Sequence, residues 1–266
     1  MKKVYLFVIL LFFFLGCSKE KPIPNNSEST KVFQFDDSEI RYYEKVYYKS
    51  YGNPKNEKDF AELKIEYPEL ISNQEVSDSV NKFILNYLLN LPFNEDTYSD
   101  FDEIADSLMS NYISVQQEFN DYHTSWYIHA SSKITGVFNN TISIRSEEEI
   151  YTGGANTFYN LTFANFNLKT GKYLTLDDIF NESNITIVEN IGKDIFNKMK
   201  DIPKDQSLEQ AGYWFENNVF SLNDNFSITD SGLVFFYNLY AIAPRSEGTT
   251  KLFIPKEKLI SLTNFY

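Results

Sequence analysis

Apolar positions along this chain recur with two periods, and each period predicts its own kind of element. Residues 40–49 and 60–67 are rich in aromatic and β-branched side chains and end at turn formers or at Pro68, so both predict strands. Residues 76–91 instead carry apolar side chains at helical spacing, and residues 72–75 in front of them form a capping-box pattern. The sequence therefore predicts two strands followed by an amphipathic helix.

Three further amphipathic helices are expected from the same spacing. One begins near Asp100 and has an apolar stripe that we interpret as core, namely Phe101, Ile104, Ala105, Leu108, Met109, Tyr112 and Phe119. The next covers residues 187–199, with inward-facing Val188, Ile191, Ile195, Phe196 and Met199. The last begins at a second capping box, residues 207–210, and carries Leu208, Ala211, Phe215 and Val219.

The remaining periodic segments have the character of strands and cover residues 125–134, 141–152, 157–168, 226–229, 233–238 and 251–254. Asn139-Asn140 and Gly153-Gly154 stand at turn or bulge positions between them. We interpret Glu147-Glu148-Glu149 as a solvated edge, because neighbouring strand residues point to opposite faces. Since strands and helices come in separated runs, we expect an α+β fold with largely antiparallel sheets, packed with amphipathic helices in two adjoining subdomains.

The N-terminal residues have the pattern of a targeting signal. Lys2 and Lys3 precede an apolar run at residues 4–15, which is too short to span a membrane but fits the core of a signal peptide. Gly16 followed by Cys17 at its end resembles the lipobox of bacterial lipoproteins, in which the cysteine is acylated with diacylglycerol and becomes the mature N-terminus. The pattern predicts a lipid anchor at Cys17.

This anchor defines the first two segments of the chain. We expect a signal peptide at residues 1–16 and a polar, flexible tether at residues 17–31. The protein would then be extracytoplasmic and attached to a membrane through its N-terminal diacylglyceryl cysteine. Ser18-Lys19 offers no aspartate signal for retention at the inner membrane, so the outer membrane is favoured where the cell has one.

Charge narrows the range of partners. The 266 residues include 37 acidic and 24 basic side chains, for a formal net charge of −13. Without Lys2 and Lys3 the basic count falls to 22, and the charge becomes −15. Such a chain repels phosphate backbones, so we expect no nucleic-acid partner. Its single cysteine excludes a disulfide framework and any CxxC site, and we expect no metal and no cofactor.

Several stretches carry a family resemblance. The run at 151–156 with its continuation to residue 180, the run at 228–235 and the loop at 240–248 look like the extracytoplasmic domain of RsiV-type anti-sigma factors. We assign this domain to residues 145–266. Residues 63–84 in front of it are similar to the PdaC-type domain, which we assign to residues 32–144.

The resemblance implies a binding surface, since RsiV-type domains are known for capturing lysozyme. We assign candidate ligand contacts to two loops of this region, at Tyr151, Gly153, Gly154, Asn156, Tyr240 and Arg245. The family pattern has histidine where this chain has Asn156. An asparagine forms hydrogen bonds, but it is neither a base at neutral pH nor a good ligand for transition metals.

The leading hypothesis is a non-catalytic, lipid-anchored binding module of the cell envelope that recognises an envelope glycan such as peptidoglycan, or a lysozyme-like protein. The negative charge would speed encounter with a basic partner. One alternative is an envelope glycan hydrolase or a deacetylase-associated enzyme, in which His123 and His129 with Asp121 form a metal or acid–base site. Two partly buried histidines near a sheet edge explain the same pattern. A third hypothesis is a purely structural envelope lipoprotein.

Overall fold

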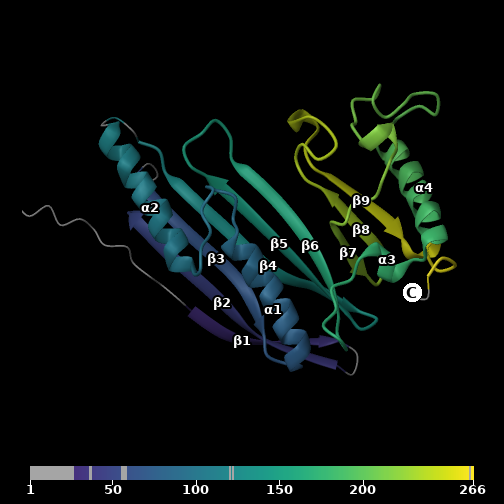
Figure 1. Cartoon of the computed structure of the whole chain (residues 1–266), viewed down its shortest axis with the longest axis horizontal. Coiled ribbons are helices and arrows are strands. Elements are labelled where there is room, and N and C mark those ends of the chain that lie inside the picture. Colours follow the sequence, from purple (N-terminus) through teal and green to yellow (C-terminus); the bar gives the residue numbers. More distant parts are fainter. Residues whose placement is uncertain (1–26, 36–37, 55–58, 120, 122, 264) are drawn as a thin grey trace, which may run out of the picture.

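The computed structural model describes residues 27–35, 38–54, 59–119, 121, 123–263 and 265–266 (Figure 1). The predicted signal peptide and Cys17 lie outside the described residues. The first strand begins at Ser27, inside the stretch predicted to be a tether. In the part of the chain that the structure describes, no helix is long and apolar enough to cross a membrane.

Six strands form the larger of two sheets, in which spatial order follows chain order. They are β1 (Ser27–Phe35), β2 (Ser38–Gly52), β3 (Phe60–Leu70), β4 (Trp126–Phe138), β5 (Thr141–Tyr151) and β6 (Phe158–Asn167). Every neighbouring pair is antiparallel except β3 and β4, which are parallel. Parallel strands need a crossover connection, and helices α1 (Gln74–Leu89) and α2 (Phe101–Glu118) provide it.

Helices α1 and α2 cover one face of this sheet, and their apolar stripes form the first core with the strand residues beneath them (Figure 1). Two details differ from the sequence prediction. The N-cap of α1 is Asn73, whose side chain accepts hydrogen bonds from backbone N–H groups, whereas Ser72 Oγ accepts one from the Arg41 N–H. Phe119, predicted to lie in the core, is 55 % exposed because α2 ends one residue before it.

A smaller unit follows β6. Its antiparallel sheet consists of β7 (Phe226–Thr229), β8 (Gly232–Tyr237) and β9 (Thr250–Pro255). Its helices are α3 (Leu176–Ile179) and α4 (Glu182–Met199), with 3-10 turns η1 (Glu216–Asn218), η2 (Arg245–Glu247) and η3 (Lys256–Lys258). Val188 and Phe196 of α4 are buried as predicted. The inward positions predicted for Met199 and Val219 are wrong, since both side chains are exposed.

The helix predicted to begin at Ser207 is also wrong. The capping box between Ser207 and Gln210 does form. After a single turn, however, the Tyr213 N–H donates a hydrogen bond to the Leu208 carbonyl, five residues back, around Gly212 at a φ of 87°. This left-handed glycine and its bridging bond are typical of a Schellman motif, which ends the turn before a helix develops.

The two units meet on the sheet face opposite α1 and α2, where β7 packs against β4, β5 and β6. Ser143 Oγ of β5 donates to the Ile228 carbonyl at 3.0 Å, and Asn165 Nδ2 of β6 donates to the Phe226 carbonyl at 2.7 Å. The domain boundary predicted at residue 145 lies inside β5. The buried apolar residues form two clusters, and the chain passes from the first cluster to the second between β6 and α3. The predicted fold class, α+β with two adjoining subdomains, is confirmed.

Candidate functional site

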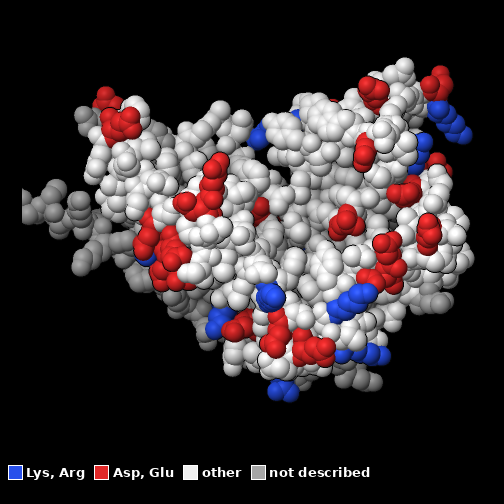
Figure 2. Space-filling view, viewed as in Figure 1, with Lys and Arg blue, Asp and Glu red and all other residues white. Residues whose placement is uncertain are grey.

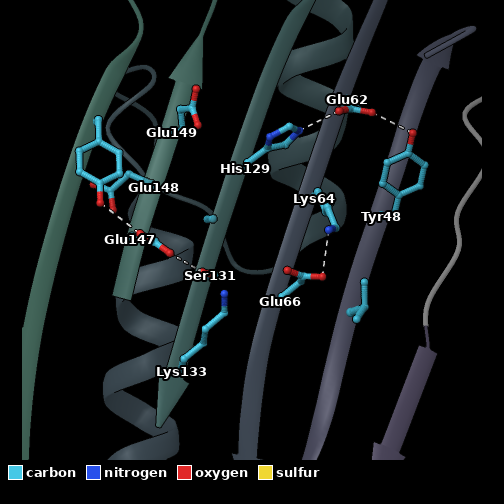
Figure 3. Close-up of a pocket in the computed structure, with 13 residues that line it drawn as sticks. Tyr48, Glu62, Lys64, Glu66, His129, Ser131, Lys133, Glu147, Glu148 and Glu149 are labelled. Atoms are coloured by element: carbon cyan, nitrogen blue, oxygen red, sulfur yellow. Dashed lines mark hydrogen bonds and ion pairs between the residues drawn. The ribbon is translucent and has the colours of Figure 1, made fainter. Parts of the chain in front are cut away.

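The sheet face opposite α1 and α2 carries a groove with a volume of about 650 Å³ (Figure 3). Strand alternation makes this face polar. Leu63 and Ile65 of β3 are buried under the helices, whereas the residues on either side of them face the groove. The lining comes from five strands and includes Tyr48, Glu62, Lys64, Glu66, His129, Ser131, Lys133, Glu147, Glu149 and Tyr159.

The run Glu147-Glu148-Glu149 is not the solvated edge that we predicted. It lies on β5, which has β4 and β6 on either side. Glu147 and Glu149 share the groove face, whereas Glu148 faces the helices, as strand alternation requires. Glu148 is only 3 % exposed; its Oε1 accepts a hydrogen bond from Asn160 Nδ2 at 3.0 Å, and burial raises the pKa of its carboxyl to about 7.

A chain of hydrogen bonds crosses the groove from β4 to β2. His129 Nε2 lies 2.7 Å from Glu62 Oε1, and the Tyr48 hydroxyl donates to Glu62 Oε2 at 2.9 Å. The bond to His129, more than any other interaction, holds the pKa of the Glu62 carboxyl below its usual value. Both oxygens of this carboxylate are therefore engaged, and Glu62 is fixed in its charged form.

Glu66 and Glu147 of the lining are held in a similar way. Lys64 Nζ lies 2.9 Å from Glu66 Oε1 on the same strand. Arg145 pairs with Glu147 at 2.5 Å, and the Tyr159 hydroxyl donates to the same carboxylate at 3.1 Å. The groove thus presents donors and acceptors whose positions are set by one another.

At one end of the groove, Tyr127 connects three parts of the site. Its ring stacks on His129 with a centroid distance of 4.9 Å and lies 5.8 Å from the ring of Tyr151. Its hydroxyl donates to Glu149 Oε1 at 3.0 Å and lies 3.4 Å from Thr157 Oγ1. Tyr127 therefore links the groove to the loop between β5 and β6.

The structure brings only part of the predicted contact set together. Tyr151 ends β5 beside Tyr127, and Gly153, Gly154 and Asn156 lie in the adjoining loop at residues 152–157. Arg245 Nη2 lies 3.4 Å from the Thr157 carbonyl, at the limit for a hydrogen bond, so η2 meets this loop.

Tyr240 belongs to a neighbouring surface. It is 59 % exposed, and its carbonyl accepts a hydrogen bond from Trp214 Nε1 at 3.4 Å. The backbone N–H of Trp214 donates a separate hydrogen bond to the Ile242 carbonyl at 2.9 Å. Tyr240 is thus placed beside Trp214, and no contact of the described residues joins it to the groove.

The two histidines do not form a common site. His123 precedes β4 and contacts Asp59 through Nδ1 at 2.9 Å, whereas His129 contacts Glu62. Within the described ranges, no group of three or more His, Cys, Asp and Glu side chains is arranged to hold a metal ion. The metal or acid–base pair considered for His123, His129 and Asp121 therefore has no geometric support.

Comparison with known proteins agrees with this architecture. The family described as "Deacetylase PdaC" matches residues 54–159, and the family described as "Protein of unknown function (DUF3298)" matches residues 177–257. The chain thus contains a PdaC-like domain followed by a DUF3298 domain. The PdaC part of the resemblance is confirmed. None of the curated proteins matches this chain.

Two solved structures have the same fold. A DUF3298 family member from Bacteroides fragilis has 19% sequence identity and a TM-score of 0.60, over 92% of this chain and 95% of that chain. A DUF3298 family protein from Pseudomonas aeruginosa PAO1 has 14% identity and a TM-score of 0.55, over 92% of this chain and 96% of that chain. At these identities the likeness shows the fold alone.

Proposed function

We propose that this protein is a non-catalytic binding module, anchored by lipid in the bacterial cell envelope, and that its groove binds an envelope glycan. The observation that carries this proposal is the lining of the groove, in which carboxylates and tyrosine hydroxyls hold one another in place on strands. Sugar hydroxyl groups both donate and accept hydrogen bonds, so fixed donors and acceptors suit them. Side chains that are already held lose little conformational freedom on binding.

The electrostatics of the groove favour binding over hydrolysis. Glycoside hydrolysis uses two carboxyl groups beside the scissile bond, of which the general acid has a raised pKa. On the groove face, the pKa of Glu62 is lowered instead. Among the described residues, the carboxyl with a clearly raised pKa is that of Glu148, and strand alternation directs it toward the helices.

The envelope location rests on the lipobox at Cys17 and on the resemblance to RsiV-type extracytoplasmic domains. Acylation would attach the folded body to a membrane through the residues before Ser27. Metabolic labelling with palmitate tests this in cells. We expect label and membrane fractionation in the native chain, and loss of both in a Cys17→Ser chain. An unlabelled native chain in the cytoplasm would overturn the proposed location.

A second candidate ligand is a lysozyme-like protein. The observation that favours it is the pair Trp214 and Tyr240, whose side chains are 48 % and 59 % exposed and whose loops are joined by a hydrogen bond. Protein interfaces are enriched in aromatic anchors of this kind. Acidic side chains are spread over the molecular face in Figure 2, and they would attract a basic partner.

One titration separates the two ligands. The lipoprotein purified in detergent is titrated with muropeptides and, separately, with lysozyme, and the muropeptides are then examined for cleavage. We expect the muropeptides to bind without being cleaved. His129→Ala should weaken this binding, and Trp214→Ala should leave it unchanged. Lys193→Ala is the control, because Lys193 is an exposed residue of α4 in the chain's second unit and is not among the residues that line the groove.

The outcomes are distinct. Lysozyme binding that Trp214→Ala abolishes would replace the glycan with a protein partner. Absence of binding to either probe at high micromolar concentration would remove both ligands. Turnover of muropeptides that depends on His129 would overturn the non-catalytic part of the proposal.

A further inference from the structure

Three rings lie in contact at the Tyr127 end of the groove. Tyr127 and Tyr151 are direct partners across β4 and β5, and Tyr127 stacks on His129, two residues further along its strand. All three side chains share the groove face because they occupy positions of the same parity. Tyrosine rings attract a cation placed over them, and they also pack well against the C–H face of a sugar.

The carboxylate of Glu149 lies beside these rings and differs in its partners from the other carboxylates of the groove. Glu149 is the partner of His129 across the two strands and is two residues before Tyr151. Its Oε1 accepts a hydrogen bond from the Tyr127 hydroxyl at 3.0 Å. Among the interactions of the described residues, no Lys, Arg or His side chain pairs with Glu149. Glu62, Glu66 and Glu147, in contrast, each contact a basic side chain.

The Tyr127 hydroxyl fixes the carboxylate of Glu149, and no hydrogen bond from another described residue occupies its second oxygen, which is therefore open to a ligand. An oriented carboxylate without a basic partner, next to tyrosine rings, is the arrangement that binds a primary ammonium group through a charge-assisted hydrogen bond and a cation–π contact. Resting on the glycan-binding function above, we propose that Glu149, Tyr127 and Tyr151 form a subsite for the protonated amino group of an amino sugar. The groove therefore prefers a de-N-acetylated glycan to its N-acetylated counterpart.

The groove is long enough for an oligosaccharide. A second hollow of about 340 Å³ shares Val46, Glu66 and Lys133 with the first and continues along β2 and β3 to Pro68. From Glu62 to Pro68 the strand rises by roughly 20 Å. A chain of several sugars can therefore occupy the groove with one amino group at the Tyr127 end.

A matched pair of probes tests the subsite. Chitotetraose and its fully de-N-acetylated form have the same backbone and differ in whether each nitrogen carries an acetyl group or a charge. Each is titrated calorimetrically into the detergent-purified lipoprotein at mildly acidic pH and constant salt. We expect the amino form to bind the native chain about tenfold more tightly, the effect of one good charge-assisted contact.

Three variants test which residues cause the preference for the de-N-acetylated tetramer. Glu149→Gln should abolish it, so that both tetramers bind with similar affinity, and Tyr151→Leu should reduce it. Glu118→Gln removes the same charge from an exposed position on α2 and should leave the preference intact. Thermal melting of each variant verifies that it is folded.

The results distinguish this inference from the function on which it rests. Equal affinity of the native chain for the two tetramers overturns the amino subsite and leaves glycan binding in place. Failure of both tetramers to bind overturns both proposals. A preference that survives Glu149→Gln, or that Glu118→Gln lowers equally, would arise from the overall negative charge and would also overturn the subsite.

Discussion

The side-chain amide of Asn225 hydrogen-bonds the backbone of Leu161 as a neighbouring strand would. Its Nδ2 donates to the Leu161 carbonyl at 2.7 Å, while its Oδ1 accepts from the Phe163 N–H at 2.7 Å. Asn238 adds a second amide, whose Oδ1 and Nδ2 engage the Leu161 N–H and carbonyl at 2.9 Å each. The outer edge of β6 is thereby closed against pairing with another chain, and the C-terminal unit is tied to the large sheet.

Replacing Asn225 with alanine should loosen this junction. The change leaves a backbone N–H and a carbonyl of β6 without their partners in a partly buried position, so we expect a loss of about 2 kcal/mol in the free energy of unfolding. Denaturant titration measures it. Asn190→Ala is the control, because the Asn190 amide donates to the Thr186 carbonyl within α4 at an exposed site. Equal losses in the two variants would contradict the role of Asn225.

Local sequence signals predicted those elements whose cause is local. Asn139-Asn140 makes the tight β4–β5 turn with both residues at positive φ, 46° and 57°, which asparagine tolerates better than most residues. The capping box of Thr175 and Asp178, another local pattern, begins α3. By contrast, the single glycine at Gly212 overrode the apolar spacing that predicted a helix from Ser207.

The groove could not be predicted in the same way. His129 and Glu62 are 67 residues apart and meet because β3 pairs in parallel with β4 across two helices. Alternating polar positions on β3 and β4 indicate a sheet with one polar face, but they do not indicate which strands adjoin. The prediction of a solvated edge at Glu147-Glu148-Glu149 is wrong for the same reason. Only the pairing of β5 with β6 shows that these residues lie inside the sheet.

Gly171 is constrained by both its conformation and its surroundings. It has a φ of +67°, and a Cβ there would lie 2.8 Å from both the Glu75 carbonyl oxygen and Ser79 Oγ of α1. Gly171→Ala should therefore cost about 1–3 kcal/mol of stability. In Gly154→Ala the new methyl meets nothing within 4 Å, so we expect a change within about 0.5 kcal/mol. Thermal unfolding compares the two, and a neutral Gly171→Ala would contradict the tight docking of this turn on α1.

The low pKa of Glu62 depends on its partner on β4. His129→Phe removes the hydrogen bond that lowers this pKa most, so the pKa of the Glu62 carboxyl should rise. The carboxyl carbon shift followed by NMR against pH measures it directly. His123→Phe provides the control, because His123 contacts Asp59 and not Glu62. An unchanged Glu62 titration in His129→Phe would mean that the two groups are not paired in solution.

Glu148 should make the protein less stable as pH rises. Burial raises the pKa of its carboxyl to about 7, whereas an unfolded glutamate titrates near 4.3. Between these values the folded chain binds more protons than the unfolded chain, so the free energy of unfolding falls as pH increases. The contribution is lost as pH rises through about 7 and amounts to about 4 kcal/mol. Unfolding titrations from pH 4 to 8 measure it.

Comparison with a neutral isostere isolates this carboxyl. Glu148→Gln keeps an oxygen that can accept the hydrogen bond from Asn160 Nδ2, but it has no charge to bury. The difference in unfolding free energy between the native chain and Glu148→Gln should therefore shift in favour of the variant as pH rises. Every other titrating group is present in both chains and cancels in that difference. A difference that stays constant across the range would mean that Glu148 titrates normally and that its side chain is not buried.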